Sequence, residues 1–217
     1  MTNESVYADG DYFRTRFPYN ESKITVWDAV ADYLDRKYGI GETVVDVGAG
    51  YGYFLRGVEA ERKFAVDHSS YPLKKAEADR TLIGDVTEIP IKRDTADTVM
   101  ISNVLEHLLT EDIQTALSEV RRVLRPQGIL FIVTPNFALA PRQYFDDFTH
   151  KTILTHHSLA DLISISGFTE RDRIVRFLPF SSEERLPISR LLVRLYLHSP
   201  VSPLAGQSLF VATPTGH

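Results

Sequence analysis

Short apolar runs alternate with segments of helical periodicity over the first two-thirds of this 217-residue chain. The predicted strands are rich in Val and Ile and are bounded by Gly, Asp or Pro: Thr43–Val47, Lys63–Asp67, Thr81–Gly84, Thr98–Ser102 and Gly128–Thr134. The segments with helical character between them are Gly52–Glu61, Ser70–Ala78, Asn103–Leu109 and Glu111–Leu124, the last with Thr110 placed to cap it. This alternation predicts a doubly wound, Rossmann-like α/β fold, in which helices cover both faces of a mostly parallel sheet.

The flanking segments extend this core. We predict an amphipathic helix over Ser22–Tyr38, a helix over His157–Ser166, and two further strands at Arg171–Phe177 and Ser208–Ala212. The sheet then has seven strands, the last of them antiparallel. The length fits one domain, in which residues 1–40 form an N-terminal cap, 41–134 bind a cofactor, and 135–217 bind an acceptor and complete the sheet.

Composition excludes several kinds of chemistry. The chain has no Cys, so disulfides, thiolate metal sites, iron–sulfur clusters and a cysteine nucleophile are ruled out. Its formal charge of -5, without long runs of one sign, gives little support for nucleic-acid binding. No stretch approaches about 18 uninterrupted apolar residues, and the N-terminus lacks the pattern of a signal peptide. These features predict a cytoplasmic protein.

A glycine-rich loop follows the first predicted strand and opens a helix, where a ligand can approach the backbone closely. Its spacing, Gly48, Gly50, Gly52, is G-x-G-x-G and differs from the G-x-G-x-x-G of dinucleotide-binding folds. Asp46 stands just before the glycines. Asp67 ends the second strand about 20 residues later, where a carboxylate can accept hydrogen bonds from ribose hydroxyls. The loop therefore favours an adenosine ligand other than a dinucleotide.

Five motifs in order make the chain resemble the class I S-adenosylmethionine-dependent methyltransferases. They are Val45-Asp-Val-Gly-Ala-Gly-Tyr-Gly52, Phe64-Ala-Val-Asp67, Gly84-Asp85 with Ile89-Pro90, Asp97-Thr-Val-Met-Ile-Ser-Asn-Val-Leu-Glu-His107, and Val123-Leu-Arg-Pro-Gln-Gly-Ile-Leu130. The resemblance implies that S-adenosyl-L-methionine is the cofactor. Gly48 and Gly50 would flank its methionine part, Asp67 would hold the ribose, and Asp85 the adenine amino group. The remaining residues that it implies as cofactor-binding are Asp46, Ala49, Gly52, His68, Val86, Ser102 and Asn103, with the backbone near the last two holding the ammonium.

Each of these acids also has a structural interpretation. Asp46 could cap the following turn, Asp67 could be a solvated strand end, and Asp85 could be a turn residue. We interpret Glu106 and His107 as mainly structural, because a helix that opens there needs polar groups for its free amides. Two other functions stay open: a nicotinamide-dependent oxidoreductase, and a non-catalytic regulatory protein that binds the cofactor.

The residues after the fourth strand narrow the choice of acceptor. Ser-Asn-Val-Leu stands there instead of the Asn-Pro-Pro-Tyr type of sequence, which disfavours methylation of adenine or glutamine nitrogen. An oxygen or amine acceptor in a small molecule, lipid-linked intermediate or glycan remains. The last third also resembles, through Arg176-Phe-Leu-Pro-Phe180, Arg185-Leu-Pro187, Leu192-Val-Arg-Leu-Tyr196 and Gly206-Gln207…Phe210-Val211, a subgroup found with polysaccharide and glycolipid biosynthesis. This second resemblance implies O-methylation of a sugar.

Candidate catalytic residues gather after the fifth strand, within Pro135–His150. His150 has a suitable pKa for a general base, and Asp147 could orient its ring, with Tyr144 nearby and His107 as the main competitor. The alternative is a purely structural role, in which Asp147 and His150 cap a turn. His156 and His157 favour the start of a helix; a metal site that joins them to Asp146 or Asp147 lacks a diagnostic spacing, so we predict no metal.

The remaining hypotheses concern the two ends of the chain. Tyr7–Phe17 is predicted to fold over the cofactor as a lid, with Arg16 paired to the cofactor carboxylate; an irrelevant, disordered tail is the alternative. Residues 185–206 carry three arginines and an apolar stripe at helical spacing, so they could contact an anionic membrane surface. Packing on the sheet or on a second subunit explains the same stripe. The oligomeric state is unknown.

Overall fold

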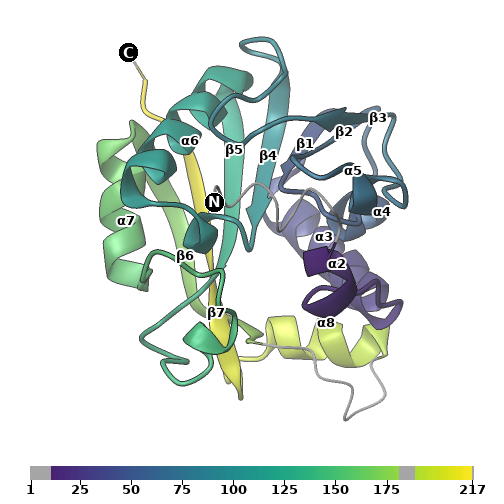
Figure 1. Cartoon of the computed structure of the whole chain (residues 1–217), viewed down its shortest axis with the longest axis vertical. Helices are drawn as coiled ribbons and strands as arrows, with labels where there is room; N and C mark the ends of the chain where they lie inside the picture. The colour runs from purple at the N-terminus through teal and green to yellow at the C-terminus, as the bar shows by residue number, and fades with distance from the viewer. Residues whose placement is uncertain (1–10, 181–188, 217) are drawn as a thin grey trace.

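The computed structural model describes residues 11–180 and 189–216, and a seven-stranded sheet lies at its centre (Figure 1). The strands are β1 Thr43–Val47, β2 Arg62–Asp67, β3 Arg80–Ile83, β4 Ala96–Ser102, β5 Leu124–Pro135, β6 Phe168–Pro179 and β7 Ala205–Pro214. Their order is β3-β2-β1-β4-β5-β7-β6. Neighbours from β3 to β5 pair in parallel, whereas β7 pairs antiparallel with β5 and β6. The predicted fold class is confirmed.

Helices cover both faces of this sheet (Figure 1). The described helices are α2 Asp11–Thr15, α3 Ser22–Tyr38, α4 Tyr53–Gly57, α5 Ser70–Leu73, α6 Thr110–Val123, α7 His156–Ile165 and α8 Arg190–His198, with 3₁₀ turns η1 Leu105–His107 and η2 Tyr144–Asp146. Residues of α6 and α7 share one buried apolar cluster with alternate residues of the strands. Residues of α3 and α4 share a second cluster with the intervening strand residues.

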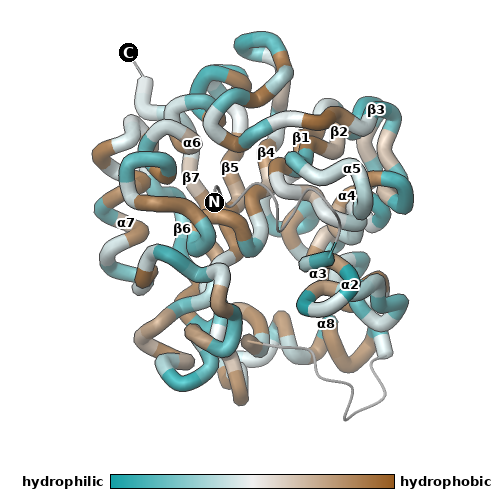
Figure 2. The backbone as a smooth tube through the Cα atoms, viewed as in Figure 1, coloured by the Kyte–Doolittle hydropathy of each residue, from teal (hydrophilic) through white to brown (hydrophobic). Residues whose placement is uncertain are grey.

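Strand β5 shows how the sequence produces this sandwich. Leu130 and Ile132 lie in the cluster of α6 and α7, while Phe131 and Val133 lie in the cluster of α3 and α4. All four side chains are fully buried. A central strand that is covered on both faces therefore reads as an unbroken apolar run, whereas apolar and polar residues alternate along α7 (Figure 2).

Several predicted helices are shorter than expected. The segment Asn103–Leu109 forms only η1, and α4 ends at Gly57 instead of Glu61. A Cβ atom at Gly57 would lie 2.7 Å from the Cα of Asp28 in α3, so the end of α4 approaches α3 very closely. The prediction that Thr110 caps α6 is wrong, because the helix begins at that residue. Glu111 and Asp112 lie in its first turn, where their negative charges interact favourably with the helix dipole.

Helix α8 carries the apolar stripe predicted near the end of the chain. Leu191, Leu192 and Leu195 are each more than half exposed. One of the arginines, Arg194, pairs with Asp32 of α3 at 2.9 Å and so ties α8 to the body of the protein. None of the helices within the described residues is long and apolar enough to cross a membrane. Membrane contact through residues 185–206 remains a prediction, and residues 185–188 lie outside the described part.

Candidate functional site

The candidate site lies at the carboxyl edge of the sheet, where β1 and β4 are neighbours although they are not consecutive in the chain. Chain connections leave such a pair of strands in opposite directions, and open α/β sheets bind ligands in the crevice that results. The glycine loop follows β1. Ser102 is the last residue of β4, and Asn103 comes directly after it. The arrangement thus brings the predicted cofactor residues of these two strands to one edge.

Glycine is required at two positions of the loop. Gly48 has a φ of 73°, and a Cβ there would lie 2.2 Å from Cγ2 of Val104. Gly52 has a φ of 70°, and a Cβ there would lie 2.8 Å from Cβ of Ala76. The amides of Gly48 and Ala49 both donate to the carbonyl of Val66 in β2, at 2.8 and 3.0 Å. The loop is therefore held tightly against β2, with a backbone that larger residues would disturb.

Asp67 ends β2 and anchors this loop from the other side. Its Oδ2 accepts from the amide of Gly50 and its Oδ1 from the amide of Ser69, both at 2.9 Å. Nδ1 of His68 lies 3.6 Å from Oδ1. Burial raises the pKa of the Asp67 carboxyl, although these amides and His68 act in the opposite direction. The carboxylate is thus placed beside the loop, as a ribose-binding group requires. The alternative, that Asp67 is only a solvated residue at the end of a strand, does not apply, because its side chain is buried.

Asp46 lies deeper, at the end of β1, and is buried. Burial raises the pKa of its carboxyl to about 8, and the neighbouring charge of Asp67 acts in the same direction. Two carboxyl groups therefore stand next to each other beneath the loop, and the inner one holds its proton near neutral pH. A cationic group of a ligand would lower the cost of ionising it.

Changing Asp46 to Asn is expected to flatten the pH dependence of stability. The folded pKa is above the unfolded value of about 4, so the folded chain binds more protons, and stability falls as pH rises from about 4 to about 8. In this pH range the free energy of unfolding of the wild type falls by roughly 1 kcal/mol per pH unit because of Asp46, and the variant lacks this contribution. Urea unfolding of the cofactor-free protein at several pH values measures the slope. Equal slopes for wild type and variant would contradict the expectation; Asp161→Asn, on the exposed side of α7, is the control.

Asp85 occupies a turn after β3. Its Oδ1 accepts from the amide and the hydroxyl of Thr87, at 2.7 and 2.6 Å, and the side chain is exposed. Val86 beside it is buried in the core. The structure therefore shows Asp85 in the turn role. The adenine contact remains a prediction.

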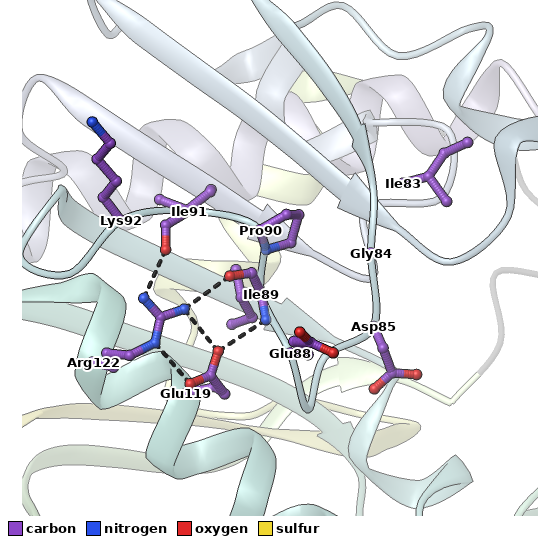
Figure 3. A pocket seen from close by; sticks show the side chains of 10 residues that line it. All are labelled: Ile83, Gly84, Asp85, Glu88, Ile89, Pro90, Ile91, Lys92, Glu119 and Arg122. Atoms are coloured by element: carbon purple, nitrogen blue, oxygen red, sulfur yellow. Dashed lines mark hydrogen bonds and ion pairs between the residues drawn. The ribbon is translucent and has the colours of Figure 1, made fainter.

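A hollow of about 680 Å³ borders this turn (Figure 3). Its lining includes Gly84, Asp85 and Pro90. Across it, Arg122 of α6 donates to the carbonyls of Ile89 and Ile91, each at 2.8 Å, as Figure 3 shows. This contact ties the segment after Asp85 to α6.

The end of β4 has a strained backbone. Asn103 has a φ of 54°, a conformation uncommon for residues other than glycine. Its side-chain amide donates to the hydroxyl of Ser102 at 3.0 Å, and its backbone amide donates to Val133 in β5. Such strain concentrates at functional sites. It turns the chain sharply at the point where the resemblance places the ammonium of the cofactor.

Helix α2 connects the glycine loop with the segment after β5. The hydroxyl of Tyr51 donates to the carbonyl of Phe13 at 3.3 Å, and the hydroxyl of Tyr12 donates to Asp147 at 3.1 Å. Arg16 donates to the backbone carbonyl of Asp146 at 2.7 Å. This placement favours the predicted lid over an irrelevant tail; Tyr7 lies outside the described residues. The pairing of Arg16 with a cofactor carboxylate stays a prediction.

The predicted catalytic residues do come together, with one unexpected connection. Oδ1 of Asp147 accepts from the hydroxyl of Thr149 at 2.5 Å, and that same hydroxyl lies 2.9 Å from Nδ1 of His107. Burial acts to raise the pKa of Asp147, but the hydrogen bonds from Thr149 and Tyr12 and the charge of His107 together outweigh it, so the pKa is lowered. The carboxylate therefore orients His107 through a hydroxyl, and not His150 as the sequence predicted.

His150 stands beside His107, with ring centroids 4.8 Å apart. Its Nδ1 donates to the backbone carbonyl of Tyr144. Burial lowers the pKa of both rings, that of His107 to about 4, where the charge of His150 adds to the effect. The hydroxyl of Tyr144 donates to the carbonyl of Thr152 at 2.7 Å and accepts from the amide of Leu154. The backbone carbonyl of Tyr144 thus positions His150, while the hydroxyl of Tyr144 is hydrogen-bonded to backbone groups.

Glu106, which the sequence predicts to be mainly structural, has a fully buried side chain beside the two rings. Its Oε2 accepts from the hydroxyl of Thr134 at 3.1 Å, while Oε1 has no hydrogen-bond partner among the described residues. Burial raises the pKa of this carboxyl to about 8. The sequence did carry a signal for this part of the site, namely a carboxyl and an imidazole next to each other after β4. Only the fold shows that Glu106 and His107 lie beside His150.

His156 and His157 begin α7, as predicted. The cap is Thr155, which forms a reciprocal pair of hydrogen bonds with Ser158. Nδ1 of His156 lies 3.0 Å from the side-chain amide of Asn136. Within residues 11–180 and 189–216, the carboxylate and imidazole groups close enough to share a metal ion are Glu106, His107 and His150, and neither His156 nor His157 is among them.

Comparison with known proteins gives a consistent picture. Residues 45–132 match the model of a family described as a methyltransferase domain. A search of curated proteins finds no match. Among solved structures, a SAM-dependent methyltransferase from Archaeoglobus fulgidus has 21% identity and a TM-score of 0.62, over 94% of this chain and 97% of that one.

Two further solved structures share the fold. The 1,6-didemethyltoxoflavin-N1-methyltransferase of Burkholderia thailandensis, solved with S-adenosylhomocysteine, has 20% identity and a TM-score of 0.62, over 98% of this chain and 85% of that one. A chain in a Haloferax volcanii complex that contains a methyltransferase activator has 19% identity and a TM-score of 0.69, over 96% of each chain. At these identities the likeness shows the fold.

Proposed function

We propose that this chain, a methyltransferase enzyme whose methyl donor is S-adenosylmethionine, methylates a hydroxyl group. The proposed acceptor is a sugar, or a glycan or lipid-linked intermediate that carries one. The observation that supports this proposal is the group formed by Asp147, Thr149, His107 and His150 beside the carboxyl edge of β4. It offers two imidazoles of lowered pKa to an acceptor.

The cofactor residues fit an adenosine ligand that carries a methionine part. The backbone of Gly48 and Gly50 would lie against the methionine part, because these two glycines carry no Cβ and adopt positive φ angles that other residues rarely adopt. Asp67 would accept from the ribose, and Asp85 from the adenine amino group. The backbone near Ser102 would receive the ammonium. When bound, S-adenosylmethionine supplies a methyl group on a positively charged sulfur, which is ready for attack by a nucleophile.

The chain's own task is then to make the acceptor nucleophilic and to hold it in line. A hydroxyl is a poor nucleophile at neutral pH, and a positioned group that assists loss of its proton typically contributes about 10²–10⁴-fold. His107 is held by Thr149 and Asp147, and His150 by the Tyr144 carbonyl. Both rings are neutral near pH 7 because burial lowers their pKa. Helix α2 would limit the access of water from above.

Mass spectrometry tests this proposal. Cell extract, rich in sugars and lipid-linked intermediates, is incubated with the enzyme and isotopically labelled S-adenosylmethionine. We expect the label in a methyl ether of a sugar, and only with active enzyme. Label found on nitrogen alone would overturn the choice of a hydroxyl. Cofactor binding without transfer to any component would favour the non-catalytic regulatory protein.

A further inference from the structure

We propose that Glu106, His107 and His150 bind a divalent transition-metal ion such as Zn²⁺ or Co²⁺. Each side chain offers one ligand atom, and these atoms lie within 4.8 Å of one another. They come from η1, just after β4, and from the segment after β5. The fold therefore gathers two imidazole nitrogens and a carboxylate oxygen from two distant parts of the chain.

Glu106 supplies the first independent observation. Its side chain is fully buried, and Oε1 has no hydrogen-bond partner within residues 11–180 and 189–216. The other oxygen accepts from Thr134, so the carboxyl group is fixed in place while one oxygen remains unsatisfied. A buried polar atom without a partner is costly, and native proteins rarely keep one without a reason. A cation bound at Oε1 removes this cost.

The orientation of the two imidazoles is the second observation. Nδ1 of His150 faces the carbonyl of Tyr144, which can only accept, so this nitrogen carries the proton and Nε2 carries the lone pair. The Thr149 hydroxyl gives its one proton to Asp147, so it accepts from Nδ1 of His107, and the lone pair of that ring is again on Nε2. Metal-binding histidines almost always donate their other N–H to a carbonyl or carboxylate in this way.

The donor set indicates the class of ion. Imidazole suits Zn²⁺, Co²⁺, Ni²⁺ and Fe²⁺, whereas Mg²⁺ and Ca²⁺ prefer oxygen ligands alone. Ligand atoms about 2.0–2.2 Å from a tetrahedral Zn²⁺ lie about 3.3–3.6 Å from one another, so an ion would draw these groups together by at most about 1.5 Å. Three protein ligands leave at least one position for a further oxygen atom.

For catalysis this inference rests on the proposed function. An acceptor hydroxyl beside the ion would lose its proton to solvent water more readily, because the ion stabilises the alkoxide. The oxygen lone pair would then form the new O–C bond, as the S–C bond breaks and its electron pair stays on sulfur. The two imidazoles serve here as ligands, and Asp147 with Thr149 positions one of them.

A metal titration tests the site without any measurement of activity. The full chain is freed of metal with a chelator, the chelator is removed, and Co²⁺ is added while visible absorption is recorded, with Zn²⁺ calorimetry alongside. We expect one ion per chain with micromolar or tighter affinity. Glu106→Gln and His150→Ala should weaken binding by about 100-fold or more, and Thr149→Val, which removes only an orienting hydroxyl, by about 10-fold. His157→Ala, an exposed imidazole on α7, should bind as the wild type does.

Absence of binding by the wild type, or unchanged affinity in Glu106→Gln and His150→Ala, would overturn the site. Circular dichroism reports whether each variant folds; should Glu106→Gln fail, His150→Ala and Thr149→Val still decide the question. Comparing the metal titration with the isotope-labelling experiment separates the two proposals. Metal binding without hydroxyl methylation would support the site and overturn the proposed function, whereas hydroxyl methylation without metal binding would do the reverse.

Discussion

Alanine in place of His150 is expected to lower turnover by about 100-fold or more, while the affinity for S-adenosylmethionine stays nearly unchanged. The imidazole lies beside His107 and is oriented by the Tyr144 carbonyl, whereas the predicted cofactor contacts lie on other elements. Loss of the ring removes a group that activates the acceptor, as a proton acceptor or as a metal ligand. Initial rates with the identified acceptor measure turnover, and calorimetry measures cofactor affinity.

Matched variants show which imidazole matters. His107→Ala should give a loss of similar size, and Asp147→Asn a smaller one, because Thr149 stands between that carboxylate and the ring. His157→Ala, outside the site, is the control. Near-normal turnover of His150→Ala, with a folded but inactive His107→Ala, would assign activation to His107 alone. Near-normal turnover of both variants would contradict a role for the imidazoles and would favour an amine acceptor that is only held in line.

Asp67→Ala should weaken binding of S-adenosylmethionine by about 1–3 kcal/mol, which corresponds to roughly 5–150-fold. Two effects add in the same direction. The ribose hydroxyls lose their acceptor, and the amides of Gly50 and Ser69 lose the carboxylate that holds the loop. Calorimetric titration gives the affinity of the folded variant, with thermal unfolding as a check on its stability.

The control for this variant is Asp161→Ala, which removes an exposed carboxylate from α7 and should leave cofactor affinity unchanged. Wild-type affinity in a folded Asp67→Ala would contradict the ribose assignment. Equal weakening in both variants would instead indicate an effect of net charge.

Most of the fold could be predicted because its signals are local. The strand Thr43–Val47 agrees residue for residue with β1, since a strand covered on both faces is rich in Val and Ile, as the three valines here show. The helix Ser22–Tyr38 agrees equally well. Short helices were predicted less accurately. Whether α4 continues beyond Gly57 depends on its contact with α3, which is distant in sequence.

The candidate site was predictable as a set of residues but not as a set of contacts. Spacing along the chain paired Asp147 with His150, which is three residues away. In the fold the carboxylate instead reaches His107, through Thr149. Likewise, no local pattern shows that Glu106 is fully buried with one oxygen that lacks a partner in the described part of the chain, because this depends on how β5 and the segment after it pack over η1. Long-range packing decides these contacts.

Calorimetric titration of the full chain with S-adenosylmethionine and with S-adenosylhomocysteine tests the central claim most directly, namely that the glycine loop and Asp67 form the cofactor site. We expect both to bind to a single site with dissociation constants of about tens of micromolar or tighter. The same titration of Asp67→Ala should give markedly weaker binding. Absence of binding of either compound to the folded wild type at those concentrations would contradict the claim.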